Sequence, residues 1–550
     1  MDIRLKRRFR IIIVFIVIIF SVLILRIINL MFFKKDTIFS PPGTPTYSER
    51  GFIVDRNGVR LALSLETYSV YARPSEVEQK KDTAEQLAAA LEKEYEDILE
   101  RLNRKRPFVW VQRQVDLKYA EKLEEINIKG IYLEKEYKRY YPENSLLSHT
   151  IGFSGVDNKG LEGIEYFLDD ILLPKRIDNK RIDYPAQRRG YTIVLTIDKY
   201  IQEIVEEEIE KAWKQTGANL ITVIVMDPST GEIMALANKP DYDLNNFGKY
   251  PETTIRNKAI TDSFEPGSTF KIFIAAILLD LGLVRENSIF ICKGSVEVEG
   301  ITIRDTAVHG RVTYRKVLEK SCNVGMVKSV KNIDNITLYE KLRSFGFGTP
   351  TGINLPGEAR GLLRTPKKWS RVSKYFMAIG QEISVTPLQL ITAASSLANK
   401  GVLMQPRIIK RLENHDGTIL KKYPPLKIRR VIEEETAEKI LDILTGVLSE
   451  NGTGYKAMIE GYNIGGKTGT AQIADTQKGG YLEGEFYASF VGFLPVPYPE
   501  IVVLVTLDRP LGEVYGGQTA APIFKNIVER IAPHLNILPS FSEIYVINDE

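Results

Sequence analysis

The sequence predicts an α+β protein in which a single N-terminal transmembrane helix precedes two folded domains. Three observations predict it: an apolar run at residues 11–33, a length of 550 residues, and strand patterns at both ends of the second domain. A chain of this length exceeds one ordinary domain and indicates two or three. The expected order is a cytoplasmic tail at 1–10, the membrane helix at 11–33, a mixed α/β domain at 34–195, a second domain at 196–536 and a tail at 537–550.

The membrane helix is predicted from the length of the apolar run. Residues 11–33 would form a helix about 34 Å long, which is enough to cross a bilayer core of about 30 Å. The run is too long for a signal-peptide core and shows no small-x-small cleavage site, so we expect an uncleaved anchor. Arg26 either snorkels to the interface or meets a partner helix in the membrane. The basic tail should stay in the cytoplasm, which places most of the chain outside it, where no ATP is available.

Composition excludes some classes of function. The chain has 44% hydrophobic and 26% charged residues, as folded proteins do. Its net charge of +4 is small for the length, so nothing favours binding to nucleic acid. The two cysteines and the four histidines are far apart in the sequence and match no zinc-ligand spacing (Cys292, Cys322, His149, His309, His415, His534). We therefore expect no metal site and no cofactor.

The first exported domain has mixed patterns. A hairpin is expected at residues 52–64, where apolar residues flank a turn that contains Asn57-Gly58. Residues 82–103 have the spacing of an amphipathic helix, and residues 108–115 read as a strand. Residues 138–166 are irregular, and the charged stretch at 174–190 reads as a loop or an extended connection.

The second domain begins and ends with strands. Residues 191–215 read as a strand followed by an amphipathic helix, and residues 219–240 read as two apolar strands around an Asp-Pro-Ser-Thr-Gly turn. Three more strands and a helix are expected near the end, at 463–473, 486–496, 500–508 and 518–532. The simplest assembly is an antiparallel sheet built from both ends of the domain and flanked by helices.

The stretch EPGSTFK, residues 265–271, places a serine three residues before a lysine at the start of an apolar run. If a helix begins near Ser268, the side chains of Ser268 and Lys271 lie on one face, a turn apart. The positive end of the helix would favour an oxyanion beside the serine. A lysine can take the proton of the serine if burial or a second cation lowers its pKa. A serine that caps a buried helix gives the same pattern, so this motif alone does not decide.

Two later motifs favour catalysis. Ser321-Cys322-Asn323 lies in a helical region, and Lys467-Thr468-Gly469-Thr470 lies in a late strand. In this order after Ser268, they resemble the active-site motifs of penicillin-binding proteins and serine β-lactamases. Other stretches over nearly the whole chain are similar to class B penicillin-binding proteins: RGFIVDRNGVRLA, KRYYP, LTIDKYIQ, DPSTGEIMALA, FGFG with INLPGE, GQEISVTPLQL and GTG. EPGSTFK and SCN look more like the septal, FtsI-type transpeptidases than the elongation type.

The resemblance implies a dimerisation-type pedestal domain at 34–195 and a serine β-lactamase/transpeptidase-like domain at 196–536. It implies a serine-type D-Ala-D-Ala transpeptidase in which Ser268 attacks the peptide carbonyl and Lys271 takes its proton. Ser321 would relay a proton to the leaving amine, with Lys467 holding Ser321 by charge and hydrogen bond. Asn323 would bind a substrate amide and contact Lys271.

Further roles follow from the same resemblance. Thr468 and Thr470 share one face of the strand because strand side chains alternate, and both would bind the terminal carboxylate. Gly469 would leave the strand surface bare for substrate. The backbone N–H groups of Ser268 and Thr470 would form the oxyanion hole, at about 3 kcal/mol for each donor. Cys322 is interpreted as a small buried residue, His309 as a loop residue, and the stretch from Arg50 to Gly58 as structural.

The predicted partners are peptidoglycan stem peptides, β-lactam antibiotics and the membrane, with an FtsW-type glycosyltransferase and FtsQ-, FtsL- and FtsB-type division proteins by resemblance. The predicted location is the cell membrane at the division site, as a single-pass protein. One alternative is an elongation-type class B enzyme with a RodA-type partner. A D,D-carboxypeptidase or β-lactamase-like hydrolase is less favoured because secreted β-lactamases usually lack an anchor and a large leading domain. A sensor would need more membrane spans, and a silent scaffold would be expected to have lost part of the three motifs.

Overall fold

The computed structural model describes residues 20–21, 49–173, 189–475 and 478–539. The predicted tail 1–10 and, except for residues 20 and 21, the predicted membrane helix 11–33 lie outside these ranges, as do most of the stretch 174–190 and most of the tail 537–550. Within the described ranges, no helix has the length and apolar character needed to cross a membrane.

The described residues form two compact units. The smaller unit holds residues 68–136, and the larger unit holds residues 49–67 and 137–539. Strand β2 (Arg60–Ala72) contributes its first residues to the larger unit and its last residues to the smaller one. These units follow the packing of the chain, and the domain boundaries predicted at 195/196 and 536/537 stay predictions.

The smaller unit combines the end of β2, strand β3 (Val109–Val115) and the first residues of β4 (Ile131–Tyr140) with helices α2 (Lys80–Leu91), α3 (Tyr95–Asn103) and α4 (Leu117–Ile126). The strand predicted at 108–115 is confirmed. The prediction of one helix over 82–103 is wrong, because the first helix ends at Glu92, whose φ of 53° is left-handed. The break lets α3 fold back on α2, so that Leu87 of α2 and Leu102 of α3 enter the same core.

The start of the larger unit forms the predicted hairpin. Strand β1 (Ile53–Val54) pairs antiparallel with β2 and parallel with β5 (Thr192–Leu195). The carboxylate of Asp55 accepts hydrogen bonds from the backbone N–H groups of Asn57 and Val59, each at 2.8 Å, and this fixes the turn. Three short helices, α5 (Ser148–Ile151), α6 (Gly163–Phe167) and α7 (Asp169–Leu172), lie in or just after the stretch that the sequence predicted to be irregular.

A buried ion cluster supports the structural interpretation of the stretch around Arg50. The guanidinium of Arg50 is fully buried and pairs with Glu165 at 2.7 Å and with Asp169 at 2.5 Å. Arg139 pairs with the other oxygen of Glu165 at 2.5 Å. Arg56, farther along the same stretch, forms an ion pair with Glu232. Together these pairs join the first hairpin to later segments of the same unit.

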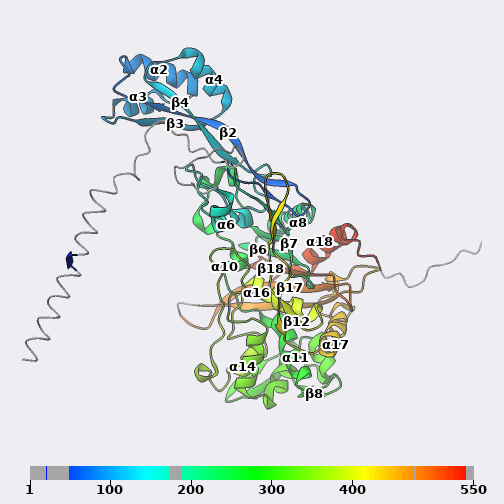
Figure 1. Cartoon of the computed structure of the whole chain (residues 1–550). Helices are drawn as coiled ribbons and strands as arrows, with labels where there is room; N and C mark the ends of the chain where they lie inside the picture. Colours follow the sequence, from blue (N-terminus) through cyan, green and yellow to red (C-terminus); the bar gives the residue numbers. More distant parts are fainter. Residues whose placement is uncertain (1–19, 22–48, 174–188, 476–477, 540–550) are drawn as a thin grey trace, which may run out of the picture. The chain divides into compact units, whose positions relative to one another are not determined.

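The central sheet confirms the assembly that the sequence predicted. Its five antiparallel strands run in the order β16 (Gly465–Ala474), β17 (Tyr481–Leu494), β18 (Ile501–Asp508), β6 (Leu220–Met226) and β7 (Ile233–Lys239). Helices α8 (Lys199–Thr216) and α18 (Ala520–His534) contact each other and pack on this sheet, and α16 (Pro387–Ala398) packs on β18 and β6 (Figure 1). The first and last thirds of the second domain therefore share one sheet.

Helices outnumber strands in the segment between β7 and β16. Among them, α11 (Lys271–Asp280), α14 (Asn335–Ser344) and α17 (Glu434–Thr445) gather at one end of this unit (Figure 1). Besides these three and α16, the segment holds η3 (Leu244–Lys249), α9 (Glu252–Ile255), α10 (Lys258–Thr261), η4 (Gly267–Phe270), β8 (Ile289–Cys292), β9 (Ser295–Val298), β10 (Ile301–Arg304), β11 (Gly310–Thr313), α12 (Tyr314–Glu319), α13 (Asn323–Ser329), η5 (Val330–Asn332), η6 (Pro366–Lys368), α15 (Ser373–Met377), β12 (Val402–Met404), β13 (Ile409–Glu413), β14 (Ile419–Lys422), β15 (Lys427–Arg430), η7 (Gly446–Leu448) and η8 (Tyr455–Ala457).

Candidate active site

Ser268 lies on the short 3-10 turn η4, directly before α11. The first eight residues of α11, from Lys271 to Leu278, are all buried, so the core of the domain fixes this helix. Gly267 begins the turn with a φ of 53°, and its N–H donates to the carbonyl of Gly380 at 3.1 Å. A left-handed φ at this position suits glycine. The partly exposed Ser268 is therefore presented on a turn that the contact with Gly380 and the buried helix α11 hold in place.

Lys271 is the centre of a hydrogen-bond network. Its ammonium donates to the backbone carbonyl of Ser321 and to Oδ1 of Asn323, both at 2.6 Å, and lies 3.3 Å from Oγ of Ser321. The side chain is fully buried. Burial lowers the pKa of Lys271 to about 8, because a low-dielectric surrounding disfavours the charged amine. An amine with this pKa can take a proton from a neighbouring hydroxyl near neutral pH.

Lys467 reaches the same serine from β16. Its ammonium donates to Oγ of Ser321 at 3.0 Å and to the carbonyl of Thr468 at 3.1 Å. Burial and the positive charge of Lys271 lower the pKa of Lys467 well below its usual value. Ser321 adopts a left-handed φ of 56°, which is uncommon for a residue with a side chain and is typical of functional sites. Its hydroxyl lies between the two amines.

The turn that carries Ser268 lies directly against the KTGT strand. A Cβ added at Gly469 would come within 2.9 Å of Cγ2 of Thr269 and 3.0 Å of the carbonyl oxygen of Pro266. It would also lie 2.3 Å from Oγ of Ser489 on β17. Gly469 thus permits the close approach of η4 to β16. The bare substrate surface that the sequence predicted at this residue stays a prediction.

Thr468 and Thr470 project from β16 beside two segments that the sequence analysis did not assign to the site. Oγ1 of Thr468 donates to Oγ1 of Thr453 at 3.0 Å, and Oγ1 of Thr470 accepts from the N–H of Gly516 at 3.1 Å. Thr453 belongs to the GTG stretch, whose resemblance to the family was noted without a role. The loop at Gly516 carries no signal in the sequence beyond its paired glycines.

Glu265, the first residue of the EPGSTFK stretch, is a further residue that the sequence analysis left without a role. Its carboxylate accepts from the N–H of Glu382 at 2.9 Å and from the hydroxyl of Tyr481 at 3.0 Å. Burial raises the pKa of Glu265. These bonds connect the segment before Ser268 with β17 and with the stretch that begins at Gly380.

The structure brings most of the predicted site residues together. Lys271, Ser321, Asn323 and Lys467 share one hydrogen-bond network, and Ser268, Thr468, Gly469 and Thr470 lie on the two elements that pack beside it. Cys322 is fully buried, and burial raises the pKa of its thiol. It lies with Cys292, Asp305 and His309 in a cluster that the sequence spacing did not reveal.

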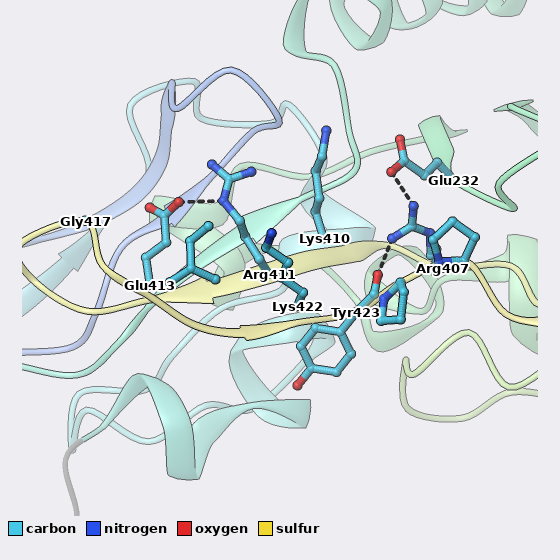
Figure 2. Close-up of a pocket in the computed structure, with 11 residues that line it drawn as sticks. Glu232, Arg407, Lys410, Arg411, Glu413, Gly417, Lys422 and Tyr423 are labelled. Atoms are coloured by element: carbon cyan, nitrogen blue, oxygen red, sulfur yellow. Dashed lines mark hydrogen bonds and ion pairs between the residues drawn. The ribbon is translucent and has the colours of Figure 1, made fainter.

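A separate cleft of about 510 Å³ lies beside β13 and β14 (Figure 2). None of the predicted site residues lines it. Basic side chains gather here, but Arg407 is paired with Glu232 and Arg411 is paired with Glu413 at 2.6 Å. Arg407 also donates to the carbonyl of Tyr423. These pairs hold the hairpin of β13 and β14 in place.

Comparisons with known proteins agree with this geometry. The model of the penicillin-binding protein transpeptidase domain matches residues 221–529, and that of the penicillin-binding protein dimerisation domain matches residues 45–175. Stage V sporulation protein D of Bacillus subtilis is 35% identical over 524 residues, which cover 91% of this chain and 80% of that protein. Peptidoglycan D,D-transpeptidase FtsI of Escherichia coli is 32% identical over 511 residues, with coverages of 90% and 84%.

Solved structures give the same result. Penicillin-binding protein 3 of Mycobacterium tuberculosis in complex with aztreonam is 30% identical and has a TM-score of 0.73, covering 90% of this chain and 97% of that one. A peptidoglycan synthetase of Bifidobacterium adolescentis is 26% identical with a TM-score of 0.72 and the same coverages. The family models, the relatives and the fold agree with one another, and this chain belongs to the class B penicillin-binding proteins as a serine-type peptidoglycan D,D-transpeptidase.

Proposed function

We propose that this chain cross-links peptidoglycan stem peptides during septal wall synthesis, through an acyl-enzyme on Ser268. The observation that carries the chemistry is the convergence of Lys271 and Lys467 on the hydroxyl of Ser321, beside the turn that presents Ser268. Two buried amines around one hydroxyl give a path for a proton without a histidine. The energy comes from the peptide bond that is exchanged, so the reaction needs no ATP.

In the proposed acylation, Oγ of Ser268 attacks the carbonyl between the two terminal D-alanines while Lys271 takes its proton. The pKa of Lys271 near 8 leaves part of the amine neutral and able to accept this proton at neutral pH. The tetrahedral intermediate then collapses, the C–N bond breaks, and D-alanine leaves. Ser321 passes the proton to the leaving nitrogen, and the charge of Lys467 favours this transfer.

In the second half-reaction, an amine from a neighbouring stem peptide attacks the ester carbonyl. The amine loses a proton to the network of Lys271 and Ser321, the ester bond breaks, and Ser268 recovers its hydroxyl. The backbone N–H groups of Ser268 and Thr470 would hold the oxyanion in both steps, at about 3 kcal/mol for each donor. Thr468 and Thr470 bind the terminal carboxylate of the donor, and Asn323 binds a substrate amide.

The septal role rests on the EPGSTFK and SCN motifs and on similarity to the Escherichia coli relative named FtsI. The proposed setting is a single-pass membrane protein at the division site, with β-lactams as inhibitors. By the same resemblance, the proposed partners are an FtsW-type glycosyltransferase and division proteins of the FtsQ, FtsL and FtsB types. An elongation-type enzyme would carry out the same chemistry with a RodA-type partner.

A donor and acceptor assay tests the chemistry. The full-length protein in detergent receives a stem pentapeptide that ends in D-Ala-D-Ala, together with a fluorescent D-amino acid as the acceptor amine. We expect transfer of the donor acyl group to the amine, loss of D-alanine, and no product with Ser268→Ala. Hydrolysed tetrapeptide as the main product would contradict transpeptidation and favour the carboxypeptidase alternative.

Depletion in living cells tests the septal assignment. Filamentous cells are the expected result, since septal cross-linking is needed to divide. Round cells would contradict the septal role and favour the elongation-type alternative. Complementation with Ser268→Ala, which leaves the anchor unchanged, should fail in both cases if the chemistry is needed.

A further inference from the structure

Four side chains of metal-binding type converge next to the SCN motif. The sulfur atoms of Cys292 and Cys322, a carboxylate oxygen of Asp305 and a ring nitrogen of His309 all lie within 4.8 Å of one another. Both cysteines are fully buried, the carboxylate of Asp305 has no exposed surface, and the side chain of His309 is 13% exposed. The group is therefore closed to solvent on nearly every side.

Each of these side chains is positioned by a different part of the local fold. Cys292 ends β8, whose partner strand β11 pairs Gly310 with Cys292, and His309 directly precedes Gly310. Asp305 follows β10, and its N–H donates to the carbonyl of Gly294 at 2.8 Å. Cys322 directly precedes α13. Since the members come from separate elements, their distances in the sequence do not resemble a zinc motif.

Backbone donors already orient two of the four side chains of this cluster. Asp305 accepts from the N–H of Val324 at 3.0 Å and from that of Thr306 at 2.9 Å. The sulfur of Cys322 accepts from the N–H of Gly325 at 3.2 Å. Such outer hydrogen bonds are typical of groups that act as metal ligands, because they fix the direction of the ligand atom.

Nδ1 of His309 supplies an independent indication of a ligand site. This atom is buried and has no hydrogen-bond partner among the residues that the structure describes, and a carboxylate oxygen of Asp305 is 3.7 Å away. A buried polar atom without a partner costs free energy, so native structures rarely contain one. A metal ion among the four side chains would satisfy this nitrogen.

We propose that Cys292, Asp305, His309 and Cys322 bind one divalent metal ion of the zinc type. Two thiolates, one imidazole and one carboxylate form a tetrahedral donor set that suits Zn²⁺. Binding releases the protons of the two thiols to solvent, while Asp305 binds as a carboxylate and His309 as a neutral ring. Four protein ligands leave no open position, so the ion has a structural role and no part in the chemistry at Ser268.

The consequence for the active site follows from the place of Cys322 in the chain. Its two neighbours, Ser321 and Asn323, both accept hydrogen bonds from Lys271. Nδ2 of Asn323 also donates at 3.1 Å to the carbonyl of Arg304, the residue before Asp305. A metal ion held by Cys322 and Asp305 would therefore fix both segments on which the position of the SCN motif depends.

A disulfide between Cys292 and Cys322 is the rival use of the two sulfur atoms, since an exported protein meets oxidising conditions. Both cysteines are free in the structure. A disulfide would leave the buried carboxylate of Asp305 without the thiol partners that lie at 2.9 Å for Cys322 and 3.4 Å for Cys292, whereas a bound metal ion would replace them as its partner. It would also leave Nδ1 of His309 without a partner, so the four-ligand arrangement favours a metal ion.

The test measures metal on the full-length protein in detergent. We expect about one equivalent of zinc per chain after extensive dialysis, measured by elemental mass spectrometry. After chelation under reducing conditions, Co²⁺ added alone should produce the absorption bands of a tetrahedral thiolate site. His309→Gln should weaken Co²⁺ binding by more than the roughly 10- to 100-fold typical of an outer-shell partner. His534→Gln is the matched control, because His534 also lies against an aspartate, Asp198 at 3.2 Å, but outside the cluster.

A second ligand variant and an acylation measurement test the proposal further. Cys292→Ser provides a second ligand variant in case His309→Gln does not fold, and it should weaken the thiolate-to-cobalt bands, because only the thiolate of Cys322 remains. Chelation should slow acylation by a β-lactam, and Zn²⁺ should restore it. Three results would overturn the proposal: absence of both zinc and the cobalt bands in the wild type, an intact-protein mass two daltons low with no metal, or equal Co²⁺ affinity in His309→Gln and the wild type.

Discussion

At the scale of single residues, the account depends on two buried amines. Lys271 and Lys467 both bind Ser321 and are both fully buried. Burial lowers the pKa of each, and the charge of Lys271 lowers that of Lys467 further. The resemblance placed these residues in one site and implied a hydrogen bond between Lys467 and Ser321, but it did not imply the contact between Lys271 and Ser321. That arrangement requires the left-handed backbone of Ser321, which no propensity scale predicts.

The rate of acylation should depend on the protonation of Lys271. With a pKa of about 8, the neutral fraction of Lys271 falls about tenfold for each pH unit below 8. The second-order rate of acylation by a penicillin should therefore rise with pH up to about 8 and then level off. Gel-based labelling at short times, in buffers from acid to alkaline pH, measures this profile. A rate that stays flat across this range would exclude Lys271 as the base.

Gly469→Ala should damage the site through packing. The new methyl group would meet Ser489 at 2.3 Å and Thr269 at 2.9 Å, so the turn of Ser268 must move away from β16. Overpacking of this kind costs about 1–3 kcal/mol of stability. A shift of about 1 Å in the nucleophile can lower the rate about 100-fold. Gly248→Ala is the control, because a Cβ there meets nothing within 4 Å, and equal acylation rates in the two variants would contradict this role.

At the scale of elements, the spacing of apolar and turn residues in the sequence predicted the strands well but the ends of the helices less well. The hairpin at 52–64 and the strands at 219–240, 463–473, 486–496 and 500–508 are confirmed, because alternation and turn residues mark them clearly. The stretch 82–103 forms two helices, separated by Glu92 in a left-handed conformation. The sequence did not predict this break because glycine, the residue that usually marks such a helix end, is not present there. The ion pairs of Arg50 could not be predicted either, because its partners Glu165 and Asp169 lie more than 100 residues away in the sequence.

Glu165→Gln should destabilise the larger unit strongly. Glu165 is fully buried and pairs with both Arg50 and Arg139, so the change leaves buried positive charge without its partner. A loss of about 3–5 kcal/mol is expected for a broken buried pair. Glu435→Gln removes an exposed pair with Lys439 on α17 and should cost less than about 0.5 kcal/mol. Thermal unfolding of the two variants compares them, and similar melting temperatures would contradict the role of the buried cluster.

His149 on α5 should make the stability depend on pH. Burial lowers its pKa from 6.5 to about 4 in the folded chain, so the folded state keeps the ring neutral. Since the folded pKa is the lower one, this stability is fully present above pH 6.5 and is lost as pH falls toward 4, by about 3 kcal/mol in total. His149→Gln should flatten the unfolding free energy in this window, whereas the exposed His415→Gln should leave it unchanged. Parallel slopes in the wild type and His149→Gln would contradict the assignment.

At the scale of the whole molecule, the sequence predicted the family, the central sheet and the site residues together. It did so because the three motifs and the flanking stretches occur in a fixed order along the chain. It could not predict the cluster of Cys292, Asp305, His309 and Cys322, because four elements bring these side chains together only in the folded chain. For the same reason it missed the contacts of Thr453 and Gly516 with the KTGT strand.

The central claim is that Ser268 is the acylated nucleophile of a peptidoglycan transpeptidase. Covalent labelling of the full-length protein by a fluorescent penicillin, read on a denaturing gel, tests it most directly. The account predicts a band that persists for many minutes in the wild type, no band with Ser268→Ala, and an unchanged band with the control Ser263→Ala, whose serine is exposed nearby in the sequence. Labelling that survives in Ser268→Ala, or that is absent from the wild type, would contradict it.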